Sequence, residues 1–160
     1  MTVIYPGSFD PPTKGHLDII QRAASLFDDV VVLTMINEKK TPFLSAQERL
    51  ELLETITKDL PNVRVGRSSR LLIEEVQSFG AGAVVRGIRS VNDFTVEQPV
   101  ADIFMRLYGV ETVFLQAQTE HSFISSSVVR EILHFGGDVT PFLPETIAQK
   151  VAEYGKRLQK

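Results

Sequence analysis

Two segments of the sequence carry groups that suit the chemistry of phosphates. The first runs from Tyr5 to His16 and reads YPGSFDPPTKGH. Ser8 offers a hydroxyl, the helix that follows offers unpaired backbone N–H groups, and His16 offers an imidazole N–H. Together these donors suit the oxygens of a reacting phosphate. The alternative is a plain strand–turn–helix connection in which the histidine is only a surface residue.

The second segment, residues 123–130, reads FISSSVVR and places three hydroxyls in a row. Consecutive serines before an apolar stretch are typical of a helix N-terminus, where a hydroxyl caps the backbone. The same arrangement can cradle the oxygens of a triphosphate with backbone N–H and hydroxyl donors. The residue types alone leave both interpretations open for Ser125, Ser126 and Ser127.

Basic residues follow two of the predicted strands. Arg86 and Arg89 flank a Gly-Ile pair, and two guanidinium groups in this spacing can serve two different phosphoryl groups. Lys39 and Lys40 follow the strand predicted over 30–36 and form a second source of positive charge. Basic residues of this kind are also common on solvated surfaces, which is the alternative for both pairs.

These segments lie within an alternation of strand and helix patterns. The run VVVLTMI is apolar, β-branched and continuous, as expected for a strand that is buried on both faces. Ser45 and Glu48 form a capping box that opens a helix, and Pro99 is expected to kink or split the helix in which it lies. Strands are predicted over 3–5, 30–36, 62–65, 83–85 and 112–115, and helices over 14–27, from 45 onward, and over 71–79, 91–108, 125–135 and 145–158.

This alternation predicts an α/β fold, namely a Rossmann-like, doubly wound sheet of about five parallel strands with helices on both faces. In such sheets, ligands bind beyond the carboxyl ends of the strands. The two segments and the two basic pairs all follow predicted strands. We therefore expect them to meet at the same edge of the sheet.

Length and composition narrow the class of protein. A chain of 160 residues fits one domain, so we expect residues 1–160 to form a single domain. The chain has no cysteine, which excludes a disulfide framework and a thiolate metal site. A net charge of −3, with both signs interspersed, argues against nucleic-acid binding. With no signal-peptide pattern and no apolar run of about 18 residues, we expect no membrane attachment and a cytoplasmic location.

The residues Thr13-Lys14-Gly15-His16 resemble the Thr/His-x-Gly-His signature of the nucleotidyltransferase superfamily. With Tyr-Pro-Gly-Ser-Phe-Asp-Pro leading into it, the segment is similar in particular to the phosphopantetheine adenylyltransferase family. The run ISSSVVR at residues 124–130 resembles the superfamily's second signature, Ile-Ser-Ser/Thr-x-x-Arg. The similarity covers nearly the whole chain, including residues 137–140 and 142–145.

The resemblance implies roles for individual residues. His16 would stabilise the transition state, and Lys40 and Arg89 would be further catalytic residues. Residues of the family that contact the phosphopantetheine substrate correspond here to Ser8, Lys40, Leu72 and Arg86. The lysine is open to an alternative: the loop after residue 36 is one residue shorter than usual, so either Lys39 or Lys40 is the functional one, and we favour Lys40.

The resemblance also implies a set of residues that bind ATP. Glu97 would hold the ribose, although without the resemblance it is equally a solvent-facing glutamate of a helix. Leu72, by its side chain, is more simply a core residue. The ATP-binding positions of the family correspond to Ser8, Phe9, His16, Gly87, Ile88, Arg89, Glu97, His121, Ser122, Phe123, Ile124, Ser125, Ser126 and Ser127.

The sequence departs from the family's pattern mainly on the acceptor side. Val96 stands where the family usually has tyrosine, and Phe104 stands where asparagine is common. By the resemblance, both would line the pocket for the acceptor's arm. His121 stands where tryptophan is common. These departures bear on the identity or affinity of the acceptor more than on the nucleotide chemistry.

The function implied by the resemblance is transfer of the adenylyl group of ATP to 4′-phosphopantetheine, giving dephospho-coenzyme A and pyrophosphate in coenzyme A biosynthesis. Mg²⁺ would be carried mainly by the nucleotide phosphates, with no dedicated protein ligands. A homohexamer and feedback binding of coenzyme A are further implications. Two alternatives stay open: a nucleotidyltransferase with another phosphorylated acceptor, such as nicotinamide mononucleotide or glycerol phosphate, and a nucleotide-binding regulator without turnover.

Overall fold

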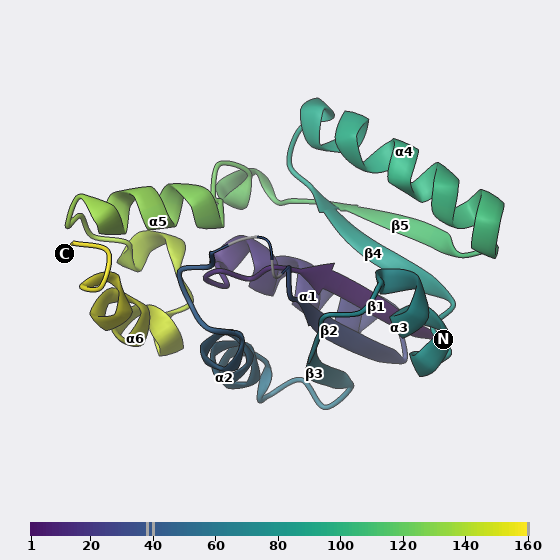
Figure 1. Ribbon diagram of the computed structural model, residues 1–160, viewed down its shortest axis with the longest axis horizontal. Helices are drawn as coiled ribbons and strands as arrows, with labels where there is room; N and C mark the ends of the chain where they lie inside the picture. The colour runs from purple at the N-terminus through teal and green to yellow at the C-terminus, as the bar shows by residue number, and fades with distance from the viewer. Residues whose placement is uncertain (38, 40, 160) are drawn as a thin grey trace.

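A five-stranded sheet forms the centre of the computed structural model, which describes residues 1–37, 39 and 41–159 (Figure 1). All neighbouring strands pair in parallel, in the order β3-β2-β1-β4-β5. Strand β1 lies at the centre. The chain first adds β2 and β3 on one side of it and then crosses over to add β4 and β5 on the other side. The strands are β1 (Thr2–Gly7), β2 (Asp29–Met35), β3 (Val63–Ser68), β4 (Ala83–Ile88) and β5 (Glu111–Gln116).

Helices connect the strands and cover both faces of the sheet. Alternate side chains of β1 point to opposite faces: Val3 packs with Ile20 of α1, whereas Ile4 packs with Val76 of α3. The predicted α/β fold with a parallel, doubly wound sheet is therefore confirmed. The helices are α1 (Lys14–Leu26), α2 (Ala46–Thr57), α3 (Leu72–Phe79), α4 (Val91–Tyr108), α5 (Ser126–His134) and α6 (Glu145–Gly155), with 3₁₀ turns η1 (Thr119–His121) and η2 (Thr140–Phe142).

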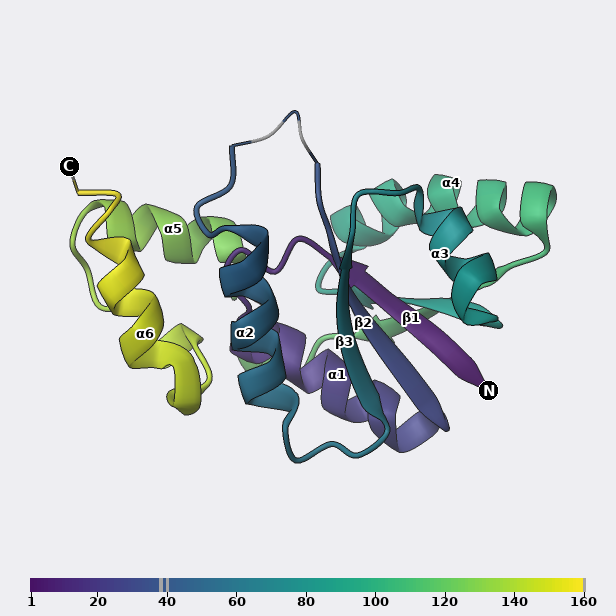
Figure 2. The same ribbon diagram turned by 60° about the horizontal axis from the view of Figure 1, so that its bottom comes forward.

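The last two helices pack beside α2 rather than on the sheet. Leu52 of α2, Leu133 of α5 and Val151 of α6 belong to one buried apolar cluster. Figure 2 shows α5 and α6 on the α2 side of the molecule, away from α4. This packing holds the N-terminus of α5 near the carboxyl edge of the sheet, where α1 also begins.

The expectation that Pro99 splits its helix needs correction. The break expected at Pro99 does not divide α4, which continues from Val91 to Tyr108. Proline removes the N–H that would pair with the carbonyl of Thr95, but both residues are exposed, so water can satisfy that carbonyl. In α2 the buried leucines are Leu52 and Leu53, because this helix packs against the sheet on one side and against α5 and α6 on another.

Candidate active site

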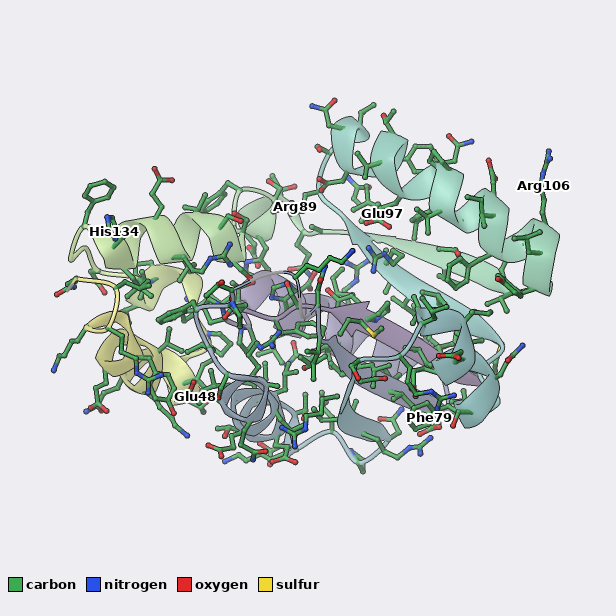
Figure 3. All side chains as sticks on the ribbon, in the orientation of Figure 1. Glu48, Phe79, Arg89, Glu97, Arg106 and His134 are labelled. Atoms are coloured by element: carbon green, nitrogen blue, oxygen red, sulfur yellow. The ribbon has the colours of Figure 1, made fainter. Side chains whose placement is uncertain are left out.

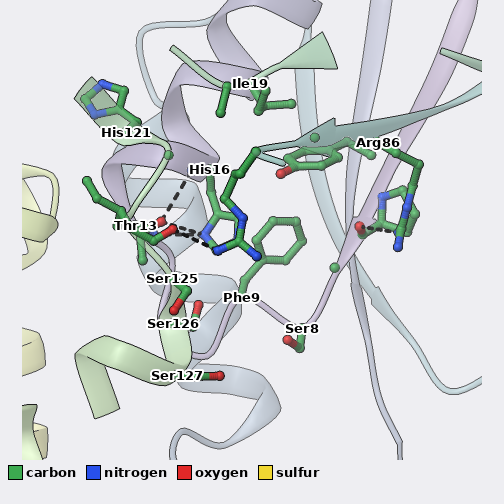
Figure 4. Close-up of a pocket in the computed structure, with 18 of the residues that line it drawn as sticks. Ser8, Phe9, Thr13, His16, Ile19, Arg86, His121, Ser125, Ser126 and Ser127 are labelled. Atoms are coloured by element: carbon green, nitrogen blue, oxygen red, sulfur yellow. Dashed lines mark hydrogen bonds between the residues drawn. The ribbon is translucent and has the colours of Figure 1, made fainter. Parts of the chain in front are cut away.

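A cavity of about 330 Å³ lies at the carboxyl ends of β1 and β4, between the starts of α1 and α5 (Figure 4). In this view His16 and the three serines lie on one side, Arg86 lies on the other, and Ser8 lies between them. The expectation that both phosphate-suited segments meet at one edge of the sheet is confirmed. The cavity is lined by Tyr5, Pro6, Gly7, Ser8, Phe9, Thr13, Gly15, His16, Ile19, Arg86, Gly87, Arg89, Glu97, Ala117, His121, Ile124, Ser125, Ser126 and Ser127.

Thr13 fixes the position of His16 in the first turn of α1. The Thr13 hydroxyl accepts the backbone N–H of His16 at 3.4 Å, and the Thr13 backbone N–H donates to His16 Nδ1 at 3.0 Å. The imidazole thus takes the place that a Glu or Gln side chain fills in an ordinary capping box. Because Nδ1 accepts a hydrogen bond, the proton of the neutral ring lies on Nε2.

The surroundings of His16 keep its ring uncharged. Burial, together with the nearby positive charge of Arg89, lowers the pKa of His16 from 6.5 to about 4. At neutral pH, Nε2 is therefore an uncharged hydrogen-bond donor beside the cavity. Such a donor can stabilise negative charge that develops on a phosphate oxygen without giving up its proton.

Phe9 supports His16 from the interior of the protein. Its ring is 1% exposed and lies edge-on to the rings of Tyr5 and His16, with centroid distances of 5.5 and 5.1 Å. The backbone of Phe9 has a φ of +48°, in a region that side-chain-bearing residues rarely adopt. A Cβ on Gly7 would lie 2.8 Å from the Phe9 ring, so glycine is required there. This turn holds a strained conformation that keeps the ring against His16.

Side chains of two helices fix the loop that carries Ser8. Arg49 of α2, only 4% exposed, donates to the Ser8 carbonyl at 2.9 Å. Arg130 of α5 donates to the Asp10 carbonyl at 2.6 Å, and Ser126 Oγ donates to the carbonyl of the next residue, Pro11, at 2.8 Å. The start of α5 is thereby tied directly to the loop after β1, which sets the spacing between the two segments.

The three serines at the start of α5 have separate partners. Ser125 is the N-cap, and its Oγ accepts the backbone N–H of Val128 at 3.2 Å. Ser126 bonds to the loop after β1, and Ser127 Oγ accepts a hydrogen bond from Arg130 at 3.2 Å. Capping and phosphate binding are compatible here. The hydroxyls order the first turn, and its backbone N–H groups stay without helical partners at the cavity.

Arg89 is oriented by Asp93, one turn further along the chain. Asp93 accepts hydrogen bonds from the backbone N–H of Arg89 at 2.9 Å and from its Nε at 3.1 Å. Burial acts to raise the pKa of Asp93, but the hydrogen bonds from Arg89 outweigh burial and lower it below its usual value. Nη1 of Arg89 donates to the Ile124 carbonyl at 3.1 Å. Arg89 therefore links the end of β4 to the segment that precedes α5.

Arg86 and Glu97 form the wall between two cavities. Arg86 Nε donates to Glu97 Oε2 at 2.8 Å and Nη2 donates to Oε1 at 2.5 Å, which makes a bidentate pair. Figure 3 shows Glu97 on the side of α4 that faces the sheet. The second cavity measures about 310 Å³, and its lining residues are mostly apolar. They are Leu72, Val84, Arg86, Val96, Glu97, Val100, Ala101, Phe104 and Thr112.

Most residues predicted to bind ATP line the first cavity, but three do not. The three are Ile88, Ser122 and Phe123. Ser122 Oγ donates to the Thr119 carbonyl at 2.9 Å, and Phe123 is 64% exposed, with its ring edge-on to Phe142. A role of these three in binding ATP stays a prediction. The predicted residues that do line the cavity are Ser8, Phe9, His16, Gly87, Arg89, Glu97, His121, Ile124, Ser125, Ser126 and Ser127.

The residues predicted to bind the acceptor divide between the two cavities. Ser8 and Arg86 line the first cavity, and Arg86 and Leu72 line the second. Lys40 lies outside the described residues. Lys39 is exposed, and its backbone N–H donates to Asn37 Oδ1 at 3.0 Å. Which lysine serves the acceptor therefore stays a prediction.

Sequence reasoning did not single out several residues that shape the site. Asp93 carried a readable signal, since Ser90 and an acidic residue three positions later are typical of a helix start, close to Arg89 in the chain. Tyr5 and Thr13 were visible only as parts of the first motif, with no role of their own. Arg49 is a basic residue within a helix, and nothing in the sequence indicates that it is buried against the Ser8 carbonyl.

Comparison with known proteins defines the class. A solved structure of a putative nicotinate-nucleotide adenylyltransferase from Vibrio parahaemolyticus superposes with a TM-score of 0.73, covers 99% of this chain and 96% of that chain, and is 21% identical, which shows the shared fold. The family described as cytidylyltransferase-like matches residues 4–132, which contain every residue of the first cavity. Fold, cavity and family match together define a nucleotidyltransferase of the cytidylyltransferase-like class.

Proteins of similar sequence identify the family within this class. A phosphopantetheine adenylyltransferase from Heliobacterium modesticaldum is 48% identical over 158 residues, covering 97% of this chain and 94% of the relative. Another, from Caldanaerobacter subterraneus subsp. tengcongensis, is 44% identical over 155 residues, covering 96% and 97%. The chain belongs to the phosphopantetheine adenylyltransferase family, as the motifs of the sequence predicted.

Proposed function

We propose that the protein transfers the adenylyl group of ATP to 4′-phosphopantetheine, forming dephospho-coenzyme A and pyrophosphate. The observation that carries the proposal is the Arg86–Glu97 pair, which is shared by two adjoining cavities of different chemistry. The first cavity offers donors for phosphates, and the second is mostly apolar. ATP would occupy the first and the pantetheine arm the second, so the acceptor phosphate would lie at their boundary.

The reaction needs no side-chain base. The acceptor phosphate is already a nucleophile, because the second pKa of a phosphomonoester is about 6. One of its oxygens attacks the α-phosphorus of ATP in line, and the bond from that phosphorus to the oxygen of the departing pyrophosphate breaks. His16 Nε2–H and the N-terminus of α1 stabilise the charge on the α-phosphoryl oxygens. Arg89 and the backbone N–H groups at the start of α5 hold the pyrophosphate.

Arg86 is the group that would meet the acceptor phosphate, with Lys40 as the second cation. Both sides of the Arg86 fork have partners within the protein: Glu97 accepts from two donors, and the Pro6 carbonyl accepts from Nη1 at 3.3 Å. An arriving phosphate competes with Glu97 for the guanidinium. A carboxylate released from Arg86 is then free to accept a hydroxyl of the nucleotide ribose.

Mg²⁺ is proposed to enter with the nucleotide. Within the described part of the chain, no three His, Asp or Glu side chains gather as a group that could hold a metal ion. Mg²⁺ usually keeps several waters and is bound by substrate phosphates with few protein ligands, so the first cavity fits a nucleotide that brings its own ion. The ion would neutralise part of the triphosphate charge, while Arg89 and the helix N-termini neutralise the rest.

We also propose feedback binding of coenzyme A and assembly into a homohexamer. Coenzyme A contains both a pantetheine arm and an adenine nucleotide, so it would bind across the two cavities and compete with both substrates as a feedback ligand. Helix α4 has no buried residue, and Val91 and Leu107, which line neither cavity, are 80% and 67% exposed. Such an apolar surface suits contact with further copies, in a cytoplasmic homohexamer. No helix in the described ranges has the length and apolarity to cross a membrane.

The experiment that tests the proposed function is pyrophosphate release from Mg-ATP with a panel of acceptors. The panel contains 4′-phosphopantetheine, nicotinamide mononucleotide, glycerol 3-phosphate and no acceptor. Release is expected with 4′-phosphopantetheine alone, together with dephospho-coenzyme A detected by mass spectrometry. Preference for another acceptor would assign the second cavity to a different substrate. Binding of ATP with no release under any condition would favour a regulator without turnover.

A further inference from the structure

Tyr5 lies toward the carboxyl end of β1 and lines the first cavity. The residue is 6% exposed, and its ring packs edge-on against Phe9 at a centroid distance of 5.5 Å. The ring is therefore a core group, buried in the same cluster as Ile19 and Ile20. The hydroxyl, in contrast, is polar and needs a hydrogen-bond partner.

The Tyr5 hydroxyl makes no hydrogen bond with any residue that the structure describes. A buried tyrosine hydroxyl usually has a partner, since leaving it without one costs free energy. In the described ranges, two side-chain polar atoms are fully inaccessible to solvent and have no hydrogen-bond partner, namely Thr34 Oγ1 and His121 Nδ1. The Tyr5 hydroxyl is not among them, so it keeps access to the cavity and can meet a ligand there.

The protonation state of Tyr5 makes it a donor. Burial raises the pKa of Tyr5 well above its usual value, and the charges of Arg86 and Arg89 offset only part of this rise. The hydroxyl therefore keeps its proton at neutral pH. A neutral hydroxyl of this kind can donate one hydrogen bond and accept others.

The position of the hydroxyl indicates which part of a nucleotide it meets. A Cβ placed on Gly87 would lie 3.7 Å from the Tyr5 oxygen and 3.1 Å from Ile19 Cγ1, so the hydroxyl lies where β4 passes over Ile19. Figure 4 shows Ile19 and the three serines of α5 on opposite sides of His16. Phosphates belong at the serine side, where the N-terminus of α5 lies. The nucleoside would then extend toward Gly87 and Tyr5.

We propose that the Tyr5 hydroxyl hydrogen-bonds the nucleoside half of ATP and so adds a specificity-determining contact to the nucleotide site. The inference rests on the proposed function to the extent that ATP is the ligand of the first cavity. It requires no acceptor and no turnover, so it can be tested by binding alone.

The test compares Tyr5→Phe with the wild-type chain by isothermal titration calorimetry, using Mg-ATP and inorganic tripolyphosphate as separate ligands. Loss of one neutral hydrogen bond is expected to raise the Kd of ATP about 3–10-fold. The Kd of tripolyphosphate should change less than about twofold, because this ligand has no nucleoside. Tyr154→Phe on α6 is the matched control, since Tyr154 lines neither cavity, and it should leave both Kd values unchanged.

The thermal unfolding midpoint separates a binding effect from a folding effect. Tyr5→Phe keeps the ring and its packing against Phe9, so its midpoint should match that of the wild-type chain. An unchanged Kd for ATP in a folded variant would overturn the proposal. Equal weakening of ATP and tripolyphosphate would also overturn it, because the contact would then be with the phosphates. Pyrophosphate release by the wild-type chain is scored separately, so failure of the proposed function would not be mistaken for failure of this contact.

Discussion

Thr13 and His16 orient one another at the start of α1 through two hydrogen bonds that run in opposite directions, from His16 N to Thr13 Oγ1 and from Thr13 N to His16 Nδ1. The same pair of contacts therefore begins the helix and selects the Nε2–H tautomer of the imidazole. The helix cap and the proposed transition-state donor are parts of one motif, which accounts for a hydroxyl residue three positions before the histidine.

Replacing Thr13 with Ala should reduce both stability and catalysis. Loss of the N-cap hydroxyl is expected to cost about 1 kcal/mol of unfolding free energy, measured by urea denaturation. Because the imidazole also loses its contact with Oγ1, kcat should fall about tenfold. Ser45→Ala removes the equivalent cap of α2, outside both cavities. It should cost similar stability and leave kcat unchanged; an equal fall of kcat in both variants would show that only stability matters.

Stability should depend on pH through His16 in a defined window. The pKa of His16 is lowered to about 4 in the folded protein from 6.5, so the unfolded chain takes up the proton first as the pH falls. The folded state is thus favoured above pH 6.5, and this contribution is lost as the pH falls toward 4. The greatest slope is about 1.4 kcal/mol per pH unit.

His16→Asn removes this titration, and His134→Asn removes a histidine of α5 that is exposed. Unfolding free energies of the three proteins would be measured between pH 4 and 6.5, the folded and unfolded pKa values of His16. His16→Asn should have a flatter slope than both the wild-type chain and His134→Asn. If His16→Asn kept the full slope, the depressed pKa of His16 would be wrong.

The fold could be predicted from the sequence because its signals are local. The apolar β-branched run that became β2 and the capping box at Ser45 both lie where they were expected, and two motifs at strand ends were brought to one cavity. Contacts between distant residues left no such signal. The burial of Arg49 against the Ser8 carbonyl and the pairing of Arg86 with Glu97 depend on packing between elements. The predicted split at Pro99 was wrong because Pro99 lies on an exposed face of α4, where water can satisfy the carbonyl that loses its helical partner.

Asp10 should be important for stability rather than for chemistry. Its carboxylate accepts the backbone N–H groups of Phe43 and Leu44, each at 2.8 Å, and the residue is 6% exposed. Asp10→Ala leaves two enclosed donors unpaired, so it is expected to lower the unfolding free energy by about 2–4 kcal/mol. Asp138→Ala is the exposed counterpart, whose carboxylate accepts the N–H of Thr140 at 2.9 Å. It should cost under about 1 kcal/mol; equal costs would contradict the role of burial.

Glu97 should limit access of the acceptor to Arg86. Its carboxylate occupies two donors of the guanidinium, so Glu97→Gln frees the fork and removes a competing negative charge. The KM for 4′-phosphopantetheine at saturating ATP is expected to fall about 2–5-fold, while the KM for ATP rises because the proposed ribose contact is weakened. Glu153→Gln, the same change at an exposed residue of α6 that lines neither cavity, should alter neither value. A higher KM for the acceptor would show that Glu97 assists its binding.

The most direct test of the account is a single-turnover measurement of dephospho-coenzyme A formation by the wild-type chain and His16→Ala, with the Kd of ATP measured on the same preparations. The rate of the chemical step is expected to fall about 10²–10³-fold, because one donor to the developing charge is lost. The Kd of ATP should stay within about twofold, since the other donors of the cavity remain. A Kd that rises as much as the rate falls would contradict the account, because His16 would then position the nucleotide and not stabilise the transition state.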